Sequence, residues 1–346
     1  MKPKPAARIY RGTPRNLARL ARLLRQGELV AVPTETVYGL AADAFNARAC
    51  RRIFAAKRRP ANDPLIVHIG SRRDLILVAE PNAAALLLAE KFWPGPLTLV
   101  LAKKASVPAV VSAGRPSVAV RMPAHPLFRR LLRLAGRPLA APSANPFGYV
   151  SPTTAEHVRR GLGREIGSIL DGGPARIGLE STIVDLRNPD RPRLLRPGAV
   201  TRRQLEHALK IPVGRAPGRA TPQGGAQLAP GLLARHYSPR TPVILHPRIS
   251  ERAAARGAAN EAWLFLAQPK NLRSRNAFWL DRRGDIRGAA RRLFATLRRI
   301  DEMGFKKINV ELAPGGGLAE AVNDRLRRAA RPAPAARVRS ARACRS

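Results

Sequence analysis

Short apolar runs alternate with amphipathic stretches over the first two thirds of the chain. Residues 13–27 open with Thr13 and Pro14, carry leucines at helical spacing and end at Gly27, which predicts a helix. Helical periodicity predicts further helices over 47–57, over two stretches between 69 and 97, and from Pro126 and Pro152. Apolar runs predict strands at 29–32, 65–69, 97–101, 117–121, 138–141, 167–170 and 182–186. This mixture predicts an α/β fold.

The pattern changes near residue 212. Residues 213–225 have no periodicity and many Gly and Pro, which is typical of a linker. Strands predicted at 242–245, 262–266 and 308–312, separated by helices at 251–259 and 286–302, indicate a second, smaller α/β unit with a parallel sheet. From Arg325 the chain is rich in Arg, Ala and Pro and is expected to be disordered. We expect a first domain over 1–210, a linker or lid over 211–239, an accessory domain over 240–330 and a basic tail over 331–346.

Charge and cysteine content bear on the partners and the cellular compartment of the protein. The 346 residues carry 63 Lys and Arg against 23 Asp and Glu, a net charge of +40. Such an excess fits either a solvated arginine-rich surface or a polyanionic partner such as nucleic acid, and composition alone does not separate the two. Cys50 and Cys344 are far apart, which fits a reducing cytosol. No signal peptide or membrane span is expected, so the predicted location is the cytoplasm, with no membrane partner.

Two loops dense in polar groups follow the first predicted strands. Residues 33–40 (PTETVYGL) come directly after the strand at 29–32, and residues 57–64 (KRRPANDP) run into the strand at 65–69. In both, hydroxyls, cations and prolines gather where a sheet meets a loop, which is where ligands are commonly bound. Three consecutive cations at 57–59 indicate an anionic ligand, with phosphate as the first candidate.

Other polar groups stand at later strand ends. Arg121 closes the strand at 117–121, residues 142–146 (PSANP) follow the strand at 138–141, and residues 180–182 (EST) open the strand at 182–186. Taken alone, each of these fits an ordinary ion pair or turn as well as a ligand contact. The chain has no Walker-type phosphate loop, the six histidines show no metal-ligand spacing, and Gly161 to Gly167 has the wrong spacing for a dinucleotide fingerprint.

In order, these motifs resemble one family. PTETVYGL, KxRP…PLIVHI, FWPGPLTLVL, VAVRMPAHP, APSAN, SPT, DGG…GxESTIVD and LLRPG follow one another over residues 12–200. This series closely resembles the YrdC-like threonylcarbamoyl-AMP synthases. Residues 229–239 and 321–326 resemble the linker and accessory domain of the long, two-domain members. The resemblance implies a twisted mixed sheet with helices and a concave basic face, plus a smaller C-terminal parallel α/β domain of Rossmann-like type.

The resemblance also implies a reaction. L-threonine, bicarbonate or CO2, and ATP would give L-threonylcarbamoyladenylate and pyrophosphate, for the threonylcarbamoyl modification of tRNA. This is nucleotidyltransferase chemistry, with Mg²⁺ accompanying ATP and no metal site in the protein. The downstream partner would be the tRNA threonylcarbamoyl transferase complex, and direct contact with tRNA or other RNA stays open.

The family's functional residues map onto this chain by motif. The catalytic set corresponds to Lys57, Arg59, Ser143 and Asn145. Contacts with ATP correspond to Arg59, Asp63, Ser117, Ser143, Ser151, Arg196 and Tyr237. Contacts with threonine correspond to Thr36, His68, Arg121 and Ser181. Arg121 suits the carboxylate of the amino acid because guanidinium and carboxylate can form two parallel hydrogen bonds.

The chain departs from the family pattern twice. Asn62 and Asp63 stand where the family has Asp followed by Asn, which places an acid at the expected ATP-contacting amide. The linker has Leu232, Leu233 and Ala234 where a lysine is usual. The resemblance implies that Tyr237 folds over ATP, so the linker would act as a lid that excludes water.

Two other functions compete with synthesis. An RNA-binding module of the same fold would explain the charge of +40, but it needs no threonine pocket. A carbamoyl-transfer relative, as in hydrogenase maturation, would carry zinc-finger-like and acylphosphatase-like segments, and the sequence shows none. The intact Lys-Arg-Ser-Asn set favours the synthase.

Overall fold

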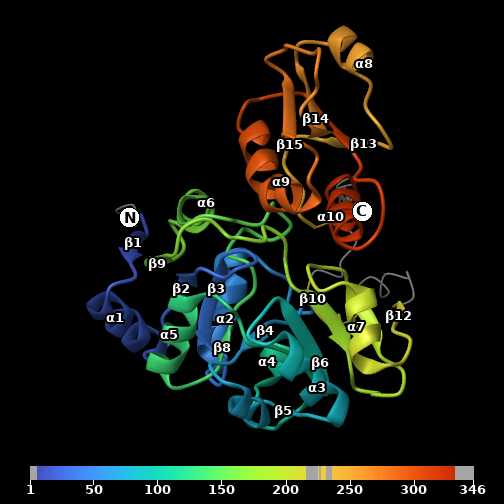
Figure 1. Cartoon of the computed structure of the whole chain (residues 1–346). Helices are drawn as coiled ribbons and strands as arrows, with labels where there is room; N and C mark the ends of the chain where they lie inside the picture. The colour runs from blue at the N-terminus through green and yellow to red at the C-terminus, as the bar shows by residue number, and fades with distance from the viewer. Residues whose placement is uncertain (1–5, 216–224, 226, 231–235, 332–346) are drawn as a thin grey trace, which may run out of the picture.

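The computed structural model describes residues 6–215, 225, 227–230 and 236–331. Within them, one large sheet fills the first part of the chain and a small sheet fills the last part, with the small sheet seated above the large one (Figure 1). The large sheet has twelve strands in the order β1-β9-β2-β3-β8-β4-β7-β6-β10-β11-β12, and β5 pairs with β6. Its strand pairs are both parallel and antiparallel, so the predicted mixed sheet is confirmed.

The elements of the first part have the following bounds. The strands are β1 Arg8–Arg11, β2 Val30–Val32, β3 Gly39–Asp43, β4 Ile66–His68, β5 Ala79–Glu80, β6 Leu97–Lys103, β7 Ser117–Arg121, β8 Leu139–Ala140, β9 Ser168–Asp171, β10 Thr182–Asp185, β11 Arg193–Arg196 and β12 Gly214–Arg215. The helices are α1 Pro14–Arg25, α2 Ala47–Lys57, the 3₁₀ helix η1 Arg72–Leu77, α3 Ala83–Phe92, α4 Ala109–Ser112, α5 Pro126–Ala135, α6 Ala155–Leu162 and α7 Arg202–Leu209.

The last part is built around four parallel strands in the order β13-β16-β14-β15, which confirms the predicted parallel sheet. Its elements are β13 Val243–His246, α8 Glu251–Arg256, β14 Glu261–Ala267, β15 Ala277–Asp281, α9 Ile286–Asp301, β16 Lys307–Glu311 and α10 Leu318–Ala329. Helices α9 and α10 lie on the side that faces the large sheet, whereas α8 lies far from it (Figure 1).

Local signals explain where most helices begin. The Thr13 hydroxyl accepts a hydrogen bond from the Asn16 N–H at 3.3 Å, and Pro14 occupies the first helical position, as the sequence predicts for α1. Helix α2 spans the predicted residues 47–57. Helix α6 begins later than expected from Pro152, because the Thr154 hydroxyl caps it by accepting from the His157 N–H at 3.2 Å.

Several strands were not predicted from the sequence. Strand β3 begins at Gly39, inside residues 33–40, which were predicted as a loop. Strand β15 was not predicted because residues 277–281 show no clear alternation of apolar and polar positions. The expectation of disorder from Arg325 is wrong for residues 325–329, which belong to α10. The physical reason is that α10 buries Ala321, Val322 and Leu326 against the small sheet despite its arginine-rich composition. The expected tail beyond residue 331 lies outside the described residues.

Hydrophobic clusters lie on both faces of the large sheet. In the last part, a small cluster packs Ala254 of α8 with Trp263 and Phe265 of β14. One cluster gathers the small sheet, α9 and α10 together with Val37, Val150, Leu179 and Tyr237. The first three of these residues belong to loops of the first part, so the two parts share an apolar core. Gly178 has a φ of +79°, and a Cβ there would lie 2.5 Å from the Arg291 Cα, so glycine allows this loop to pack directly on α9. No helix among the described residues has the length and apolar character needed to cross a membrane.

Candidate active site

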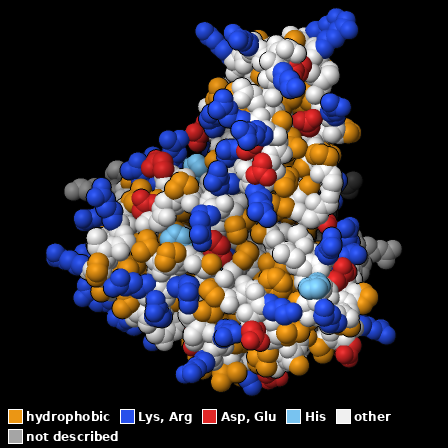
Figure 2. All heavy atoms as spheres, in the orientation of Figure 1, with side chains coloured by type: hydrophobic (Ala, Val, Ile, Leu, Met, Phe, Trp, Pro, Cys, Tyr) orange, Lys and Arg blue, Asp and Glu red, His pale blue; other side chains and the backbone are white. Residues whose placement is uncertain are grey.

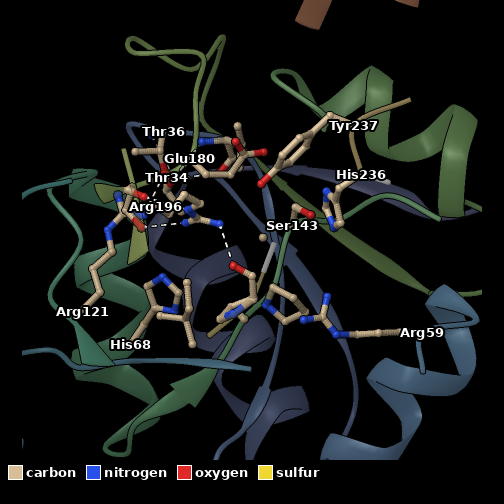
Figure 3. Close-up of a pocket in the computed structure, with 17 residues that line it drawn as sticks. Thr34, Thr36, Arg59, His68, Arg121, Ser143, Glu180, Arg196, His236 and Tyr237 are labelled. Carbon is tan, nitrogen blue, oxygen red and sulfur yellow. Dashed lines mark hydrogen bonds between the residues drawn. The ribbon is translucent and has the colours of Figure 1, made fainter. Parts of the chain in front are cut away.

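A cavity lies where loops and strand ends of the large sheet meet (Figure 3). Strands β4 and β7 pair in parallel with His68 beside Arg121, so both residues stand at the same strand ends. Gly39 forms an isolated bridge with Ser143, and a Cβ at Gly39 would come 3.4 Å from the Pro142 carbonyl oxygen. The cavity is lined by Thr34, Thr36, Val37, Gly39, Arg59, Ile66, His68, Arg121, Ala141, Pro142, Ser143, Glu180, Ser181, Arg196, Pro230, His236 and Tyr237.

The lining residues divide by position. His68 and Arg121 lie at one end, Arg59 and Tyr237 at the other, and Arg196 between the two ends (Figure 3). Eight of the predicted site residues meet at this one cavity: Thr36, Arg59, His68, Arg121, Ser143, Ser181, Arg196 and Tyr237. Lys57, Asp63, Ser117, Asn145 and Ser151 are buried and do not line it.

Arg121 is held rigidly at its end of the cavity. Its Nε donates to the Gly95 carbonyl at 3.1 Å, its Nη1 to the Thr36 hydroxyl at 2.9 Å and its Nη2 to Glu35 at 2.6 Å. Because a guanidinium carries five N–H groups, these contacts leave two N–H groups for a ligand. The side chains of Arg121 and Glu35 are 4% and 3% exposed, so the pair is buried.

His68 is neutral in this setting. Its ring packs 5.4 Å from the Phe128 ring, and its Nδ1 has no hydrogen-bond partner among the described residues. Burial, reinforced by the positive charge of Arg121, lowers the pKa of His68 to about 3. A neutral imidazole with an unpartnered nitrogen can exchange a hydrogen bond with a ligand without adding charge.

We expect His68 to stay unprotonated throughout the physiological range. Its folded pKa lies below the unfolded value of 6.5, so the unfolded chain binds more protons, and stability is lost as pH falls from about 6.5 towards about 3. The imidazole NMR signal of His68, assigned by its absence in His68→Gln, should not move between about pH 5 and 8. A signal that titrates in that range would contradict the burial of the His68 ring.

Arg59 and Asp63 form a buried pair. The Arg59 Nη2 lies 2.9 Å from the Asp63 Oδ2, with the two side chains 2% and 0% exposed. Arg59 also donates to the carbonyls of Asp63 at 2.9 Å and Pro64 at 2.7 Å. Asn62 instead contacts the linker, because its carbonyl accepts from the Gln227 N–H at 2.8 Å. The inverted Asn62-Asp63 order thus places a carboxylate on the cavity-lining arginine.

Lys57 organises the loop after β8. Its Nζ donates to the carbonyls of Ser143 and Asn145, each at 2.6 Å, and the residue is only 1% exposed. Burial and the nearby Arg59 lower the pKa of Lys57. The Asn145 side chain donates to the carbonyls of Pro146 and Tyr149, both at 2.9 Å. Both residues therefore shape the loop that presents the Ser143 hydroxyl.

A second network crosses the middle of the cavity. Arg196 donates from Nη2 to the Ser181 hydroxyl at 3.1 Å, and that hydroxyl shares a 2.7 Å hydrogen bond with Thr98. Arg196 Nη1 also donates to the Pro230 carbonyl at 3.3 Å, which connects residues 227–230 of the linker to the sheet. Ser117 stands at the opposite end of β7 from Arg121, about 13 Å along the strand.

Three residues at the cavity or beside it, Glu35, Glu180 and His236, were not among the predicted site residues. Glu35 pairs with Arg121, Glu180 accepts from the Ser151 hydroxyl at 2.5 Å, and His236 lines the cavity next to Tyr237. Their signal in the sequence was their place inside the motifs PTETVYGL, ESTIVD and the linker's HYSP. The partners of the two glutamates lie 86 and 29 residues away in sequence, so the motifs alone could not reveal these contacts.

The described linker residues cover the cavity. Pro230, His236 and Tyr237 line it, and the Tyr237 side chain is 1% exposed. With them in place the cavity measures about 40 Å³, which is far below the usual size of a pocket for a ligand. Leu232, Leu233 and Ala234, where the family's lysine is missing, lie outside the described residues, as does most of 216–235.

Comparisons with known proteins agree on one family. Residues 22–198 match the Sua5, YciO and YrdC family model described as telomere recombination, and residues 200–331 match the C-terminal domain of threonylcarbamoyl-AMP synthase. Threonylcarbamoyl-AMP synthase of Pyrococcus abyssi is 42% identical over 89% of this chain and 92% of its own length. That of Bacillus subtilis is 39% identical over 91% of this chain and 92% of its own length.

Solved structures are similar over the same span. The crystal structure of P. abyssi Sua5 complexed with L-threonine has a TM-score of 0.86 at 38% identity, covering 94% of this chain and 98% of that one. The crystal structure of E. coli YciO has a TM-score of 0.50 at 20% identity and covers 56% of this chain, which shows a common fold alone.

Proposed function

This chain belongs to the Sua5, YciO and YrdC family of threonylcarbamoyl-AMP synthases, and from that premise we propose that its reaction takes place in the cavity described above. The reaction joins L-threonine, bicarbonate and ATP into L-threonylcarbamoyladenylate and pyrophosphate. The observation that carries the assignment is the pairing of β4 with β7, which sets the predicted threonine contacts His68 and Arg121 side by side in one cavity with Arg59 and Arg196.

The end with Arg121 suits threonine. The two N–H groups that Arg121 has left can bind the α-carboxylate, while Glu35 fixes the orientation of the guanidinium. The hydroxyls of Thr36 and Ser181 and the neutral His68 can hydrogen-bond the side-chain hydroxyl and the amine. A relative with 38% identity was crystallised with L-threonine, which supports this placement.

The end with Arg59 suits the triphosphate. Threonine and bicarbonate form a carbamate with loss of water and a proton, and a carbamate oxygen then attacks the α-phosphorus of ATP as pyrophosphate leaves. Because two anions must meet, cations are needed to lower the barrier. Arg59 and Arg196 supply charge at the cavity wall and Ser143 a hydroxyl. Lys57 acts by holding the carbonyls of the Ser143 loop.

The donor set does not suit a resident metal ion. No group of three or more His, Cys, Asp or Glu side chains in the described residues has the geometry of a metal site. The cavity-lining carboxylate Glu180 is already bound by Arg325 at 2.9 Å. We propose that Mg²⁺ arrives with ATP, coordinated by its phosphates and water, which is the usual way for this ion.

Entry of both substrates requires the cover to move. A cavity of about 40 Å³ holds only a few water molecules, so Pro230, His236 and Tyr237 must withdraw before ATP can bind. Their return would shield the adenylate, which water destroys. This supports the lid predicted for residues 211–239.

The chemistry of the product indicates which partner would use it. The adenylate activates the threonylcarbamoyl group for transfer, so we propose the tRNA threonylcarbamoyl transferase complex as the partner that consumes it, in the cytoplasm. On the visible face, Lys and Arg are spread over both parts rather than gathered at one place (Figure 2). That distribution does not by itself favour direct tRNA binding.

The decisive experiment measures pyrophosphate release by the purified chain supplied with ATP, Mg²⁺, labelled bicarbonate and L-threonine. We expect release that depends on threonine, with label appearing in an adenylate. L-valine should support at least about 100-fold less, because it leaves the hydroxyl-binding groups unpaired. Release that is independent of the amino acid would reject the function, and equal use of valine would reject the threonine pocket.

A further inference from the structure

One side chain of the C-terminal part is buried beside the cavity. Arg325 of α10 has a fully buried side chain, and its Nε donates to Glu180 at 2.9 Å. Its Nη1 donates to the Pro197 carbonyl at 2.9 Å and to Asp324 at 2.8 Å. The guanidinium thus joins the last helix of the chain to a residue that lines the cavity.

The same guanidinium lies on the ring of Tyr237. Its Cζ is 5.4 Å from the ring centroid, within the range of a cation–π contact. The Phe294 ring of α9 stacks at 5.6 Å with an interplanar angle of 28°, and the His236 ring lies at 4.1 Å. The backbone of Tyr237 has a φ of +64°, which residues other than glycine rarely adopt. This conformation therefore depends on the neighbours that hold the ring in place.

Glu180 connects Arg325 to the wall of the cavity, which Glu180 itself lines. One carboxylate oxygen binds Arg325 and the other accepts the Ser151 hydroxyl at 2.5 Å. Without Arg325 the carboxylate would be left buried with one hydroxyl partner, which is costly enough to make it move.

We propose that Arg325 is a positioning residue of the ATP end of the active site. It sets the Glu180 carboxylate and the Tyr237 ring in the places where they close the cavity. The C-terminal part is therefore a structural component of the site, and not an independent appendage. The inference rests on the proposed function for the identity of ATP and on the contacts above for the positioning.

The test compares Arg325→Met and Arg325→Lys with Arg327→Met. Arg327 lies two residues away on the same helix and is exposed, so its variant controls for the loss of one cation. We expect both Arg325 variants to raise the KM for ATP at least about 10-fold, with the KM for threonine changed less than about 3-fold. Lysine should not restore the site, because it lacks the planar fork that reaches both Glu180 and Pro197. Arg327→Met should behave like the unmodified protein.

A double variant checks that Arg325 acts through Glu180. Combining Glu180→Gln with Arg325→Met should raise the KM for ATP no further than the larger single effect, because both substitutions remove the same Arg325–Glu180 interaction. Effects that multiply would overturn the proposed route. A folded Arg325→Met with a KM for ATP within about 2-fold of normal would overturn the proposal, as would equal rises in both KM values. If Arg325→Met is insoluble, Arg325→Lys decides by the same criteria.

Hydrogen exchange gives a readout that needs no activity. Peptides covering residues 178–182 and 236–238 should exchange faster in Arg325→Lys than in Arg327→Met. Unchanged exchange in these peptides would overturn the positioning role. An unmodified protein that releases no threonine-dependent pyrophosphate would reject the proposed function instead, so the two failures are distinguishable.

Discussion

Replacing Arg59 by alanine should lower turnover by at least about 100-fold, because the proposed triphosphate end would lose a fixed cation beside the developing charge. The same change should destabilise the fold by about 3–5 kcal/mol, since Asp63 would remain buried at 0% side-chain exposure without its ion-pair partner. Steady-state pyrophosphate release and thermal unfolding measure the two effects separately.

A second variant separates chemistry from stability. Arg59→Ala combined with Asp63→Asn removes the stranded charge, so we expect much of the stability to return while turnover stays low. Arg58→Gln serves as a matched control, because Arg58 is the neighbouring cation and is exposed. Near-normal turnover in the folded double variant would show that Arg59 is not part of the catalytic machinery.

Loss of Arg121 should abolish threonine binding at ordinary concentrations. Arg121→Gln would remove the two charge-assisted hydrogen bonds proposed for the carboxylate, and we expect the KM for threonine to rise at least about 100-fold with little change in the KM for ATP. Titration calorimetry with L-threonine alone measures the same loss without relying on catalysis.

Glu35 complicates that experiment and also supplies its control. In Arg121→Gln the Glu35 carboxylate, 3% exposed, loses the cation that lowers its pKa against the effect of burial. Adding Glu35→Gln relieves this charge, and the double variant should fold yet fail to bind threonine. Arg130→Gln, on the exposed side of α5, controls for the general loss of a cation. Threonine affinity within a few-fold of normal in the folded double variant would reject Arg121 as the carboxylate site.

The elements that sequence analysis predicted well are those with local causes. Helix α1 has its cap and its leucine stripe within fifteen residues, and β7 is one apolar run that ends at Arg121. Helix α10 was misjudged because its arginine-rich composition resembles a disordered tail. Its ordering comes from contacts with the small sheet and from Glu180, which lies 145 residues away.

The sequence by itself determined the family, the α/β class and eight of the side chains around the cavity, because motifs keep chemistry-bearing residues beside strand ends. Only the tertiary structure decided what each charge contacts. Lys57 binds two carbonyls, Arg59 binds Asp63, and Arg325 reaches across from the last helix to Glu180. In a chain with 63 Lys and Arg, the sequence does not show which cations are buried or which groups they contact. Those contacts form between segments that meet only after folding, since a buried charge is stable only beside groups that compensate it.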